Sequence, residues 1–95
     1  MVPVQRFMPD ALAALLRPAP LTPEKVAFAW RAAVGAAVDR ATGVELHGAT
    51  LMVVVKSDEW RHEIARSLPV IRARLNHVLG DGVVARIDLR SEGVR

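Results

Sequence analysis

The first part of the chain carries apolar residues at helical spacing, in two separate groups. A short group begins at Asp10 and ends at a proline-rich stretch, because a proline disfavours helix in the residue before it. A longer group starts at Thr22, which can cap a helix that has Pro23 in its first position. Apolar residues then recur every three or four positions. The pattern predicts a short helix followed by one continuous helix that ends near Arg40.

After Gly43 the apolar spacing changes from three or four residues to two. Apolar and polar residues alternate, a turn is expected at Gly48, and a second alternating run follows it. This pattern predicts a β-hairpin with a short strand near 44–47 and a longer strand near 50–56. The second strand is apolar on both faces, so we expect it to be central in the sheet and covered by helices.

The last part of the chain combines two further helices with one strand. Ser57 and the two acids after it predict a helix start, Pro69 separates this helix from the next, and Gly80 ends the second one. Alternating residues over Val83–Arg90 predict a final strand. The expected order is therefore α-α-β-β-α-α-β, an α+β fold in which helices cover a small three-stranded sheet.

The composition limits the classes of function. With 95 residues, of which 52% are hydrophobic and 24% charged, the chain can form one domain with a modest core. It has no cysteine, which excludes disulfides, cysteine zinc sites and thiol catalysis. No apolar run approaches the roughly 20 residues of a membrane-spanning helix, and no signal-peptide core is present. We therefore expect a soluble, cytoplasmic protein.

The sequence lacks the spacing of catalytic and metal-binding motifs. His62 and Glu63 resemble the start of a zinc-protease helix, but Arg66 stands where the second histidine would be needed. There is no Gly-x-Ser-x-Gly motif and no glycine-rich phosphate loop. We therefore expect no enzymatic activity, no metal or other cofactor, and no small-molecule substrate.

Basic residues offer a better indication of function, because 13 Lys and Arg against 10 Asp and Glu give a net charge of +3. Residues 64–80 contain three arginines and no acid, and such a region can bind phosphates with release of counterions. The candidate nucleic-acid-binding residues are Arg61, Arg66, Arg72 and Arg74. The alternative is a structural role, since Glu63 can pair with Arg66 three positions later on a helix.

The two tryptophans permit two interpretations. Trp30 and Trp60 each fall on the apolar side of a predicted helix, which indicates a position in the core. Tryptophan is also a frequent anchor of protein interfaces. On the second interpretation, Trp30 and the adjacent Arg31 are the candidate partner-binding residues.

Four short motifs occur in order along the chain. They read W-x-x-x-V-G from Trp30, G-x-x-L-x-V-x-V from Gly48, W-x-x-E-I from Trp60 and L-N-x-x-L-G from Leu75. In this order and at this spacing they resemble the DciA family of bacterial proteins. The resemblance implies a single KH-like domain over residues 1–95, with its core at about 10–90. In such a domain a leading helix precedes two strands, two helices and a third strand.

The resemblance also implies a function. DciA proteins are non-enzymatic DNA replication factors that bind the DnaB-type replicative helicase and assist its loading on DNA. They also have affinity for single-stranded or tailed DNA. We therefore expect the helicase and such DNA as partners, with weak DNA contact through basic side chains and no membrane. Many members carry a disordered arm beside the domain; this chain departs from that pattern, which puts any function of such an arm in doubt here.

The alternative function is that of a stand-alone KH-like protein that binds RNA or the ribosome. KH domains hold the nucleic-acid backbone with a Gly-x-x-Gly loop between their central helices. Here no glycine occurs between Gly48 and Gly80. This absence disfavours KH-style reading of RNA and leaves contact through arginine side chains. A small hydrolase is a third candidate, although no motif supports it.

Overall fold

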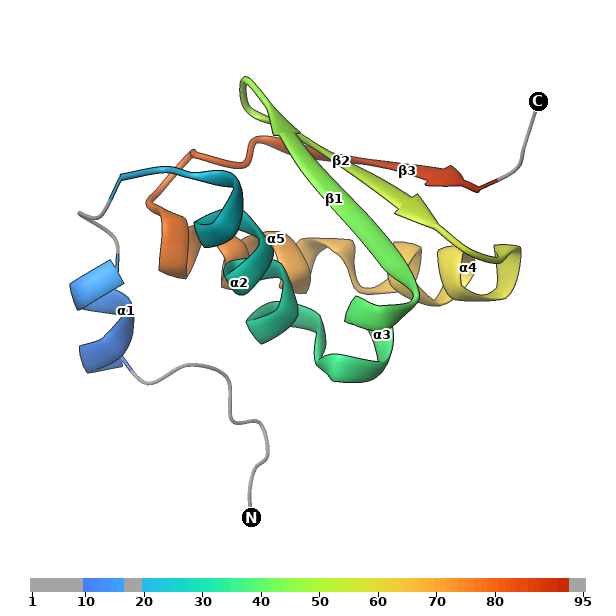
Figure 1. Ribbon diagram of the computed structural model, residues 1–95, viewed down its shortest axis with the longest axis horizontal. Helices are drawn as coiled ribbons and strands as arrows, with labels where there is room; N and C mark the ends of the chain where they lie inside the picture. The colour runs from blue at the N-terminus through green and yellow to red at the C-terminus, as the bar shows by residue number, and fades with distance from the viewer. Residues whose placement is uncertain (1–9, 17–19, 93–95) are drawn as a thin grey trace, which may run out of the picture.

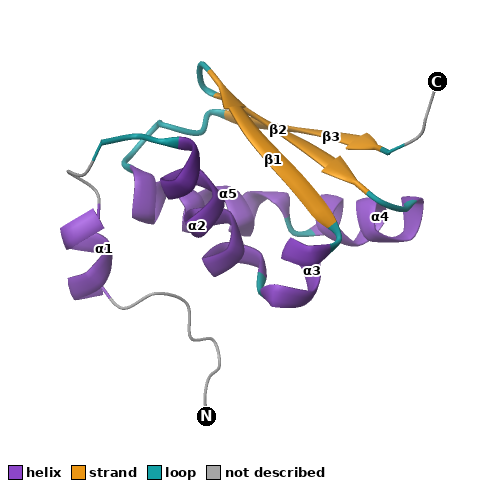
Figure 2. Ribbon diagram, viewed as in Figure 1, coloured by secondary structure: helices purple, strands orange, loops and turns teal. Residues whose placement is uncertain are grey.

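The structure is a computed structural model that describes residues 10–16 and 20–92 (Figure 1). Its elements are α1 (Asp10–Leu16), α2 (Pro23–Val34), α3 (Ala36–Arg40), β1 (Thr42–His47), β2 (Thr50–Val55), α4 (Asp58–Arg66), α5 (Leu68–Leu79) and β3 (Arg86–Ser91). The fold is α+β, and helices and strands follow one another as predicted, with the second predicted helix divided into α2 and α3. Figure 2 shows α2 to α5 on the same side of the sheet.

Within the described residues, the sheet has three strands in the order β1-β2-β3. β1 and β2 form the predicted antiparallel hairpin, with Leu46 opposite Leu51. β3 pairs in parallel with β2, and Ile87 lies opposite Leu51 on that side. Parallel neighbours need a long crossover, which α4 and α5 supply. The predicted central position of β2 is therefore confirmed.

The described helices cover one face of the sheet. Leu51, Val53 and Val55 of β2 are completely buried, whereas Val54 between them is 41% exposed. Successive side chains of a strand point to opposite faces, so the three buried residues lie towards the helices and Val54 lies on the open face. β2 is thus central as expected, but helices cover only one of its two apolar faces.

The core lies between the buried face of the sheet and the helices α2 and α5. Trp30 of α2 and Leu75 of α5 are almost completely buried and belong to the same apolar cluster as Leu51. Burial of one such side chain contributes about 1.5–3 kcal/mol. Trp60 is only partly buried and packs against the margin of this cluster. These contacts hold α2, α4 and α5 in fixed positions against the sheet.

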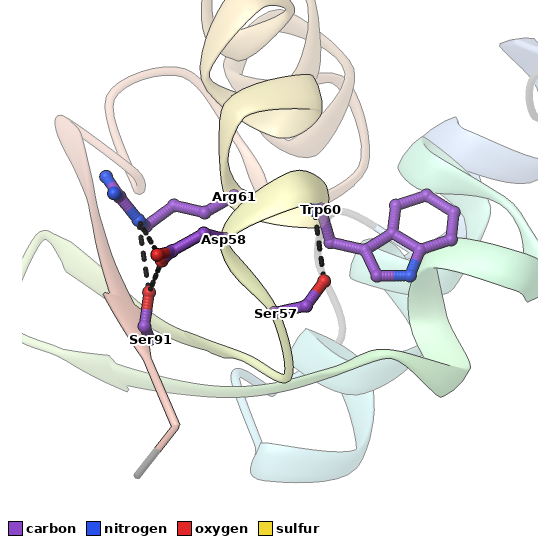
Figure 3. Close-up of polar contacts among 5 residues, drawn as sticks. All are labelled: Ser57, Asp58, Trp60, Arg61 and Ser91. Atoms are coloured by element: carbon purple, nitrogen blue, oxygen red, sulfur yellow. Dashed lines mark hydrogen bonds and ion pairs between the residues drawn. The ribbon is translucent and has the colours of Figure 1, made fainter. Parts of the chain in front are cut away.

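The predicted helix starts at Thr22 and Ser57 are confirmed. The Thr22 hydroxyl accepts a hydrogen bond from the Lys25 amide at 3.1 Å. The Ser57 hydroxyl accepts one from the Trp60 amide at 3.2 Å (Figure 3). Each hydroxyl satisfies an amide that has no partner inside its helix.

The predicted continuous helix is broken at Gly35. This residue has φ 91° and ψ 165°, a conformation that glycine adopts at low cost because it has no Cβ. Its amide donates to the Arg31 carbonyl at 2.8 Å, and its carbonyl accepts from the Asp39 amide at 2.9 Å. α2 therefore ends and α3 begins at the same residue. The apolar spacing continues through Gly35, so the spacing alone does not reveal the break.

The last strand begins three residues later than predicted. Val84 lies inside the predicted strand, but its backbone pairs with the Asn76 side chain of α5. The Val84 amide donates to Asn76 Oδ1 at 2.8 Å, and Asn76 Nδ2 donates to the Val84 carbonyl at 3.0 Å. Residues 83–85 are therefore held by α5, and pairing with β2 begins at Arg86.

Candidate functional site

The candidate arginines of α5 extend towards different elements. Arg72 Nη1 donates to the Ala85 carbonyl, just before β3, at 3.0 Å. Arg74 Nη1 donates to the Ala33 carbonyl, near the end of α2, also at 3.0 Å. Both bonds connect α5 to distant parts of the chain, and the one made by Arg74 is partly buried. Arg74 therefore has a structural role that the sequence did not indicate.

Arg61 of α4 is held by Asp58 of the same helix and by Ser91 at the end of β3 (Figure 3). Its Nε lies 3.4 Å from Asp58 Oδ1 and 3.1 Å from Ser91 Oγ. The Ser91 hydroxyl in turn donates to Asp58 Oδ1 at 2.7 Å. This polar cluster of Asp58, Arg61 and Ser91 joins the start of α4 to the end of β3. Arg61 retains a side chain that is 38% exposed, with its terminal amino groups directed away from Asp58.

The polar cluster favours the ionised form of Asp58. The hydrogen bond from Ser91 is the largest cause, followed by the bond and the charge of Arg61, and together they hold the pKa of Asp58 below its ordinary value of 3.8. A carboxyl whose pKa is lower in the folded state stabilises the fold above its unfolded-state pKa. That contribution is lost as the pH falls through the lowered pKa.

We expect the variant Asp58→Asn to have a lower Tm than the parent chain at neutral pH. The difference should shrink as the pH falls from about 6 to about 2, because the parent then protonates Asp58 and loses the same interaction. Thermal denaturation followed by circular dichroism over this range measures the effect. Glu59→Gln is the matched control, since it removes an acid from the same helical turn. A Tm difference that is constant across the range would contradict the assignment to Asp58.

Arg66 lies on the exposed surface at the end of α4. Its Nη2 is 3.5 Å from Glu63 Oε2, so the ion pair expected from their spacing is present. Both side chains are largely exposed, and pairs of this kind contribute at most about 1 kcal/mol. A phosphate group can therefore compete with Glu63 for the guanidinium of Arg66.

A shallow groove of about 200 Å³ lies between the α4–α5 junction and the start of β3. Leu68 and Ile87 contribute apolar walls, and Arg72 and Arg86 contribute two guanidinium groups. We call it the β3 groove. The sequence pattern does not indicate Arg86, because alternation in a strand gives only the face of a residue and not its distance from α5. The groove thus adds Arg86 to the candidate nucleic-acid-binding residues.

The two candidate partner-binding residues occupy different environments. Trp30 is 1% exposed, and its Nε1 donates to Thr42 Oγ1 at 2.8 Å. The Thr42 hydroxyl donates to the Val38 carbonyl at 2.9 Å, so the indole nitrogen belongs to a chain of hydrogen bonds. The structure therefore places Trp30 in the core, the first of its two interpretations. Arg31, the next residue of α2, is exposed.

The described residues contain neither a group of metal-binding side chains nor a membrane-spanning helix. Within residues 10–16 and 20–92, no group of three or more His, Asp or Glu side chains could hold a metal ion. No helix in the same segments is long and apolar enough to span a membrane.

The chain was compared with protein families and with curated proteins. The model of the family "Dna[CI] antecedent, DciA" matches residues 3–89. No curated protein matches the chain. Because the family match covers most of the 95 residues, the chain belongs to the DciA family, whose members are non-enzymatic and have a role in loading the DnaB replicative helicase.

Proposed function

We propose that this chain binds the DnaB-type replicative helicase and, while it assists loading, contacts single-stranded or tailed DNA weakly through arginine side chains. The observation that carries the proposal is the family match over residues 3–89. Such a protein acts by binding one conformation of the helicase ring more tightly than another, so it supplies binding energy and no bond chemistry. Arg31, exposed on α2, is the candidate contact residue for the helicase.

The proposal includes a single KH-like domain with its core at about 10–90 and a cytoplasmic location. The mixed sheet supports the KH-like description, because α4 and α5 connect its two parallel strands along the chain. The α4–α5 junction contains Pro69 in place of a glycine-rich loop. Without glycines the backbone at this junction is poorly suited to approach a phosphate closely, so we expect DNA contact there to use side chains.

The β3 groove is the part of the surface best suited to contact DNA. Arg72 and Arg86 border it, and the exposed Arg66 lies at the neighbouring end of α4. Guanidinium groups bind phosphate oxygens well because several N–H donors lie in one plane. A site with so few cations binds weakly, and each phosphate contact adds roughly 0.7 to the slope of log affinity against log salt for a single strand.

We expect the double variant Arg72→Gln, Arg86→Gln to bind a fluorescent single-stranded oligothymidine about tenfold more weakly and to lower the salt slope by roughly 1.4. Fluorescence anisotropy at several salt concentrations measures both quantities. Arg40→Gln removes an exposed arginine from α3 and is the matched control. Arg86→Gln alone leaves the bond from Arg72 to Ala85 intact, so its effect cannot be attributed to loss of that bond. Unchanged affinity and slope in the double variant would reject the groove.

Helicase binding is tested with the full chain and a purified DnaB-type helicase. We expect a complex at micromolar concentration and faster loading of the helicase onto tailed DNA. The absence of both complex and stimulation would contradict the proposal. Tight, salt-dependent RNA binding without any helicase complex would instead favour the stand-alone nucleic-acid-binding protein.

A further inference from the structure

β1 forms one edge of the sheet, and among the described residues no further strand pairs with its outer side (Figure 2). The Lys56 amide donates to the Ala41 carbonyl at 3.1 Å, which fixes the alternation of bonds between β1 and β2. By this alternation, Val44 and Leu46 direct their N–H and C=O groups away from β2. An added strand could therefore form hydrogen bonds with both residues.

A groove of about 250 Å³ lies beside this edge, on the face of the sheet that the helices cover. Leu21, Pro23 and Val26 line it from the side of α2, and Val44 and Leu46 line it from the side of β1. Leu21 is 52% exposed although it borders the groove. Alternate side chains of a strand added to β1 would point into this groove and cover Leu21.

The two edges of the sheet differ in their protection against strand addition. β3 carries Arg86, Asp88 and Arg90 at alternate positions, and charged side chains discourage pairing with another strand. β1 carries one acid, Glu45, and neither lysine nor proline. β1 is therefore the edge that is better suited to accept a strand.

Charge on the open face indicates which strand fits. The Glu45 side chain is 76% exposed, its Oε1 lies 3.2 Å from His47 Nε2, and the residue pairs with Met52 across the sheet. A residue opposite Glu45 on an added strand would be its direct cross-strand neighbour, so a lysine or arginine fits there. A second copy of β1 could pair antiparallel with this strand so that Val44 of each copy bonds to Leu46 of the other. That pairing would place the two Glu45 side chains directly opposite each other, and like charges in this position destabilise a strand pair.

We propose that β1 and the adjoining groove bind an extended segment of a partner protein by strand addition. The segment has apolar side chains at alternate positions, which enter the groove, and a lysine or arginine that faces Glu45. Backbone hydrogen bonds to Val44 and Leu46 hold it, and the side chains give selectivity. This site lies on the opposite edge of the sheet from the β3 groove, so a partner segment and DNA could be bound at the same time.

The test uses the full chain and a blocked peptide of alternating valine and lysine. Nuclear magnetic resonance titration is expected to shift the amide signals of Val44 and Leu46. A peptide of alternating valine and glutamate should bind at least tenfold more weakly. The net charge of +3 favours the acidic peptide in any non-specific association, so the expected preference is diagnostic. Methylation of the backbone nitrogens that face β1 should abolish binding.

Variants of the chain separate the contribution of the Glu45 charge to peptide selectivity from that of the apolar groove. Glu45→Lys is expected to reverse the peptide preference, whereas Glu59→Lys, an exposed acid on α4, should leave it unchanged. Leu21→Ser should weaken binding several-fold, and Leu15→Ser on α1 is its control because Leu15 is also exposed. These surface positions allow the folded state to be retained and checked by circular dichroism.

Several results would overturn the proposal. They are absence of binding at millimolar peptide, equal binding of the two peptides, and amide shifts confined to β3 or α5. Full retention of binding in Leu21→Ser would also count against it. A concentration-dependent dimer in sedimentation that Glu45→Lys alters would show that a second copy of the chain occupies the edge.

Discussion

The variant Trp30→Ala is expected to lose about 3–5 kcal/mol of unfolding free energy, the range found when a buried large aromatic side chain is truncated in a core. Trp30 is 1% exposed and packs in the same cluster as Leu51 and Leu75, so the substitution leaves a cavity between α2 and the sheet. It also removes the indole donor to the Thr42 hydroxyl. Urea denaturation followed by circular dichroism measures the loss.

Two further variants distinguish the parts of this effect. Trp30→Phe keeps one aromatic ring but removes the indole N–H and part of the buried volume, and we expect a loss of about 1–3 kcal/mol. Trp60→Ala should cost less than Trp30→Ala, since Trp60 is only partly buried. A loss below about 1 kcal/mol for Trp30→Ala would contradict the position of this side chain in the core.

The second large effect is expected for Asn76→Ala, at about 2–4 kcal/mol. Asn76 makes two hydrogen bonds to the backbone of Val84, and Val84 is only 1% exposed. Without the amide side chain, the Val84 N–H and C=O have no partner and little access to water, which is the costly situation for a backbone group. Urea denaturation gives the loss, and hydrogen exchange of the Val84 amide should become faster.

Arg72→Ala is the matched control for Asn76→Ala. It also removes a bond between α5 and the segment before β3, but that bond is exposed to solvent. Its loss should therefore cost less than about 1 kcal/mol. Equal losses for the two variants would contradict the view that burial of Val84 makes the Asn76 bonds important.

The elements of the fold follow from local chemistry that the sequence displays. Thr22 and Ser57 cap helices as predicted, and the change in apolar spacing after Gly43 marks the hairpin. The two errors in element boundaries arise where a local pattern competes with another interaction. The break at Gly35 depends on one backbone conformation, and the late start of β3 depends on the side chain of Asn76, a residue of another element.

The candidate site was less predictable than the fold. Arginines are visible in a sequence, but their partners are carbonyl groups far along the chain, at Ala85 for Arg72 and at Ala33 for Arg74. The proximity of Arg86 to Arg72 likewise depends on how β3 packs beside α5. Ion pairs within one helix, such as Glu63 with Arg66, were the exception, because helical spacing alone brings them together.

The parallel pairing of β2 with β3 also bears on how the chain is synthesised. β2 leaves the ribosome before α4 and α5, whereas its partner β3 follows both helices. Until β3 emerges, one side of β2 has no neighbour, and a nascent chain stalled at that stage exposes a strand rich in valine. Unpaired strands of this kind promote aggregation. The sheet is therefore completed only when β3 has been translated. Before that point the unpaired side of β2 is exposed, and a chaperone that covers it would prevent aggregation.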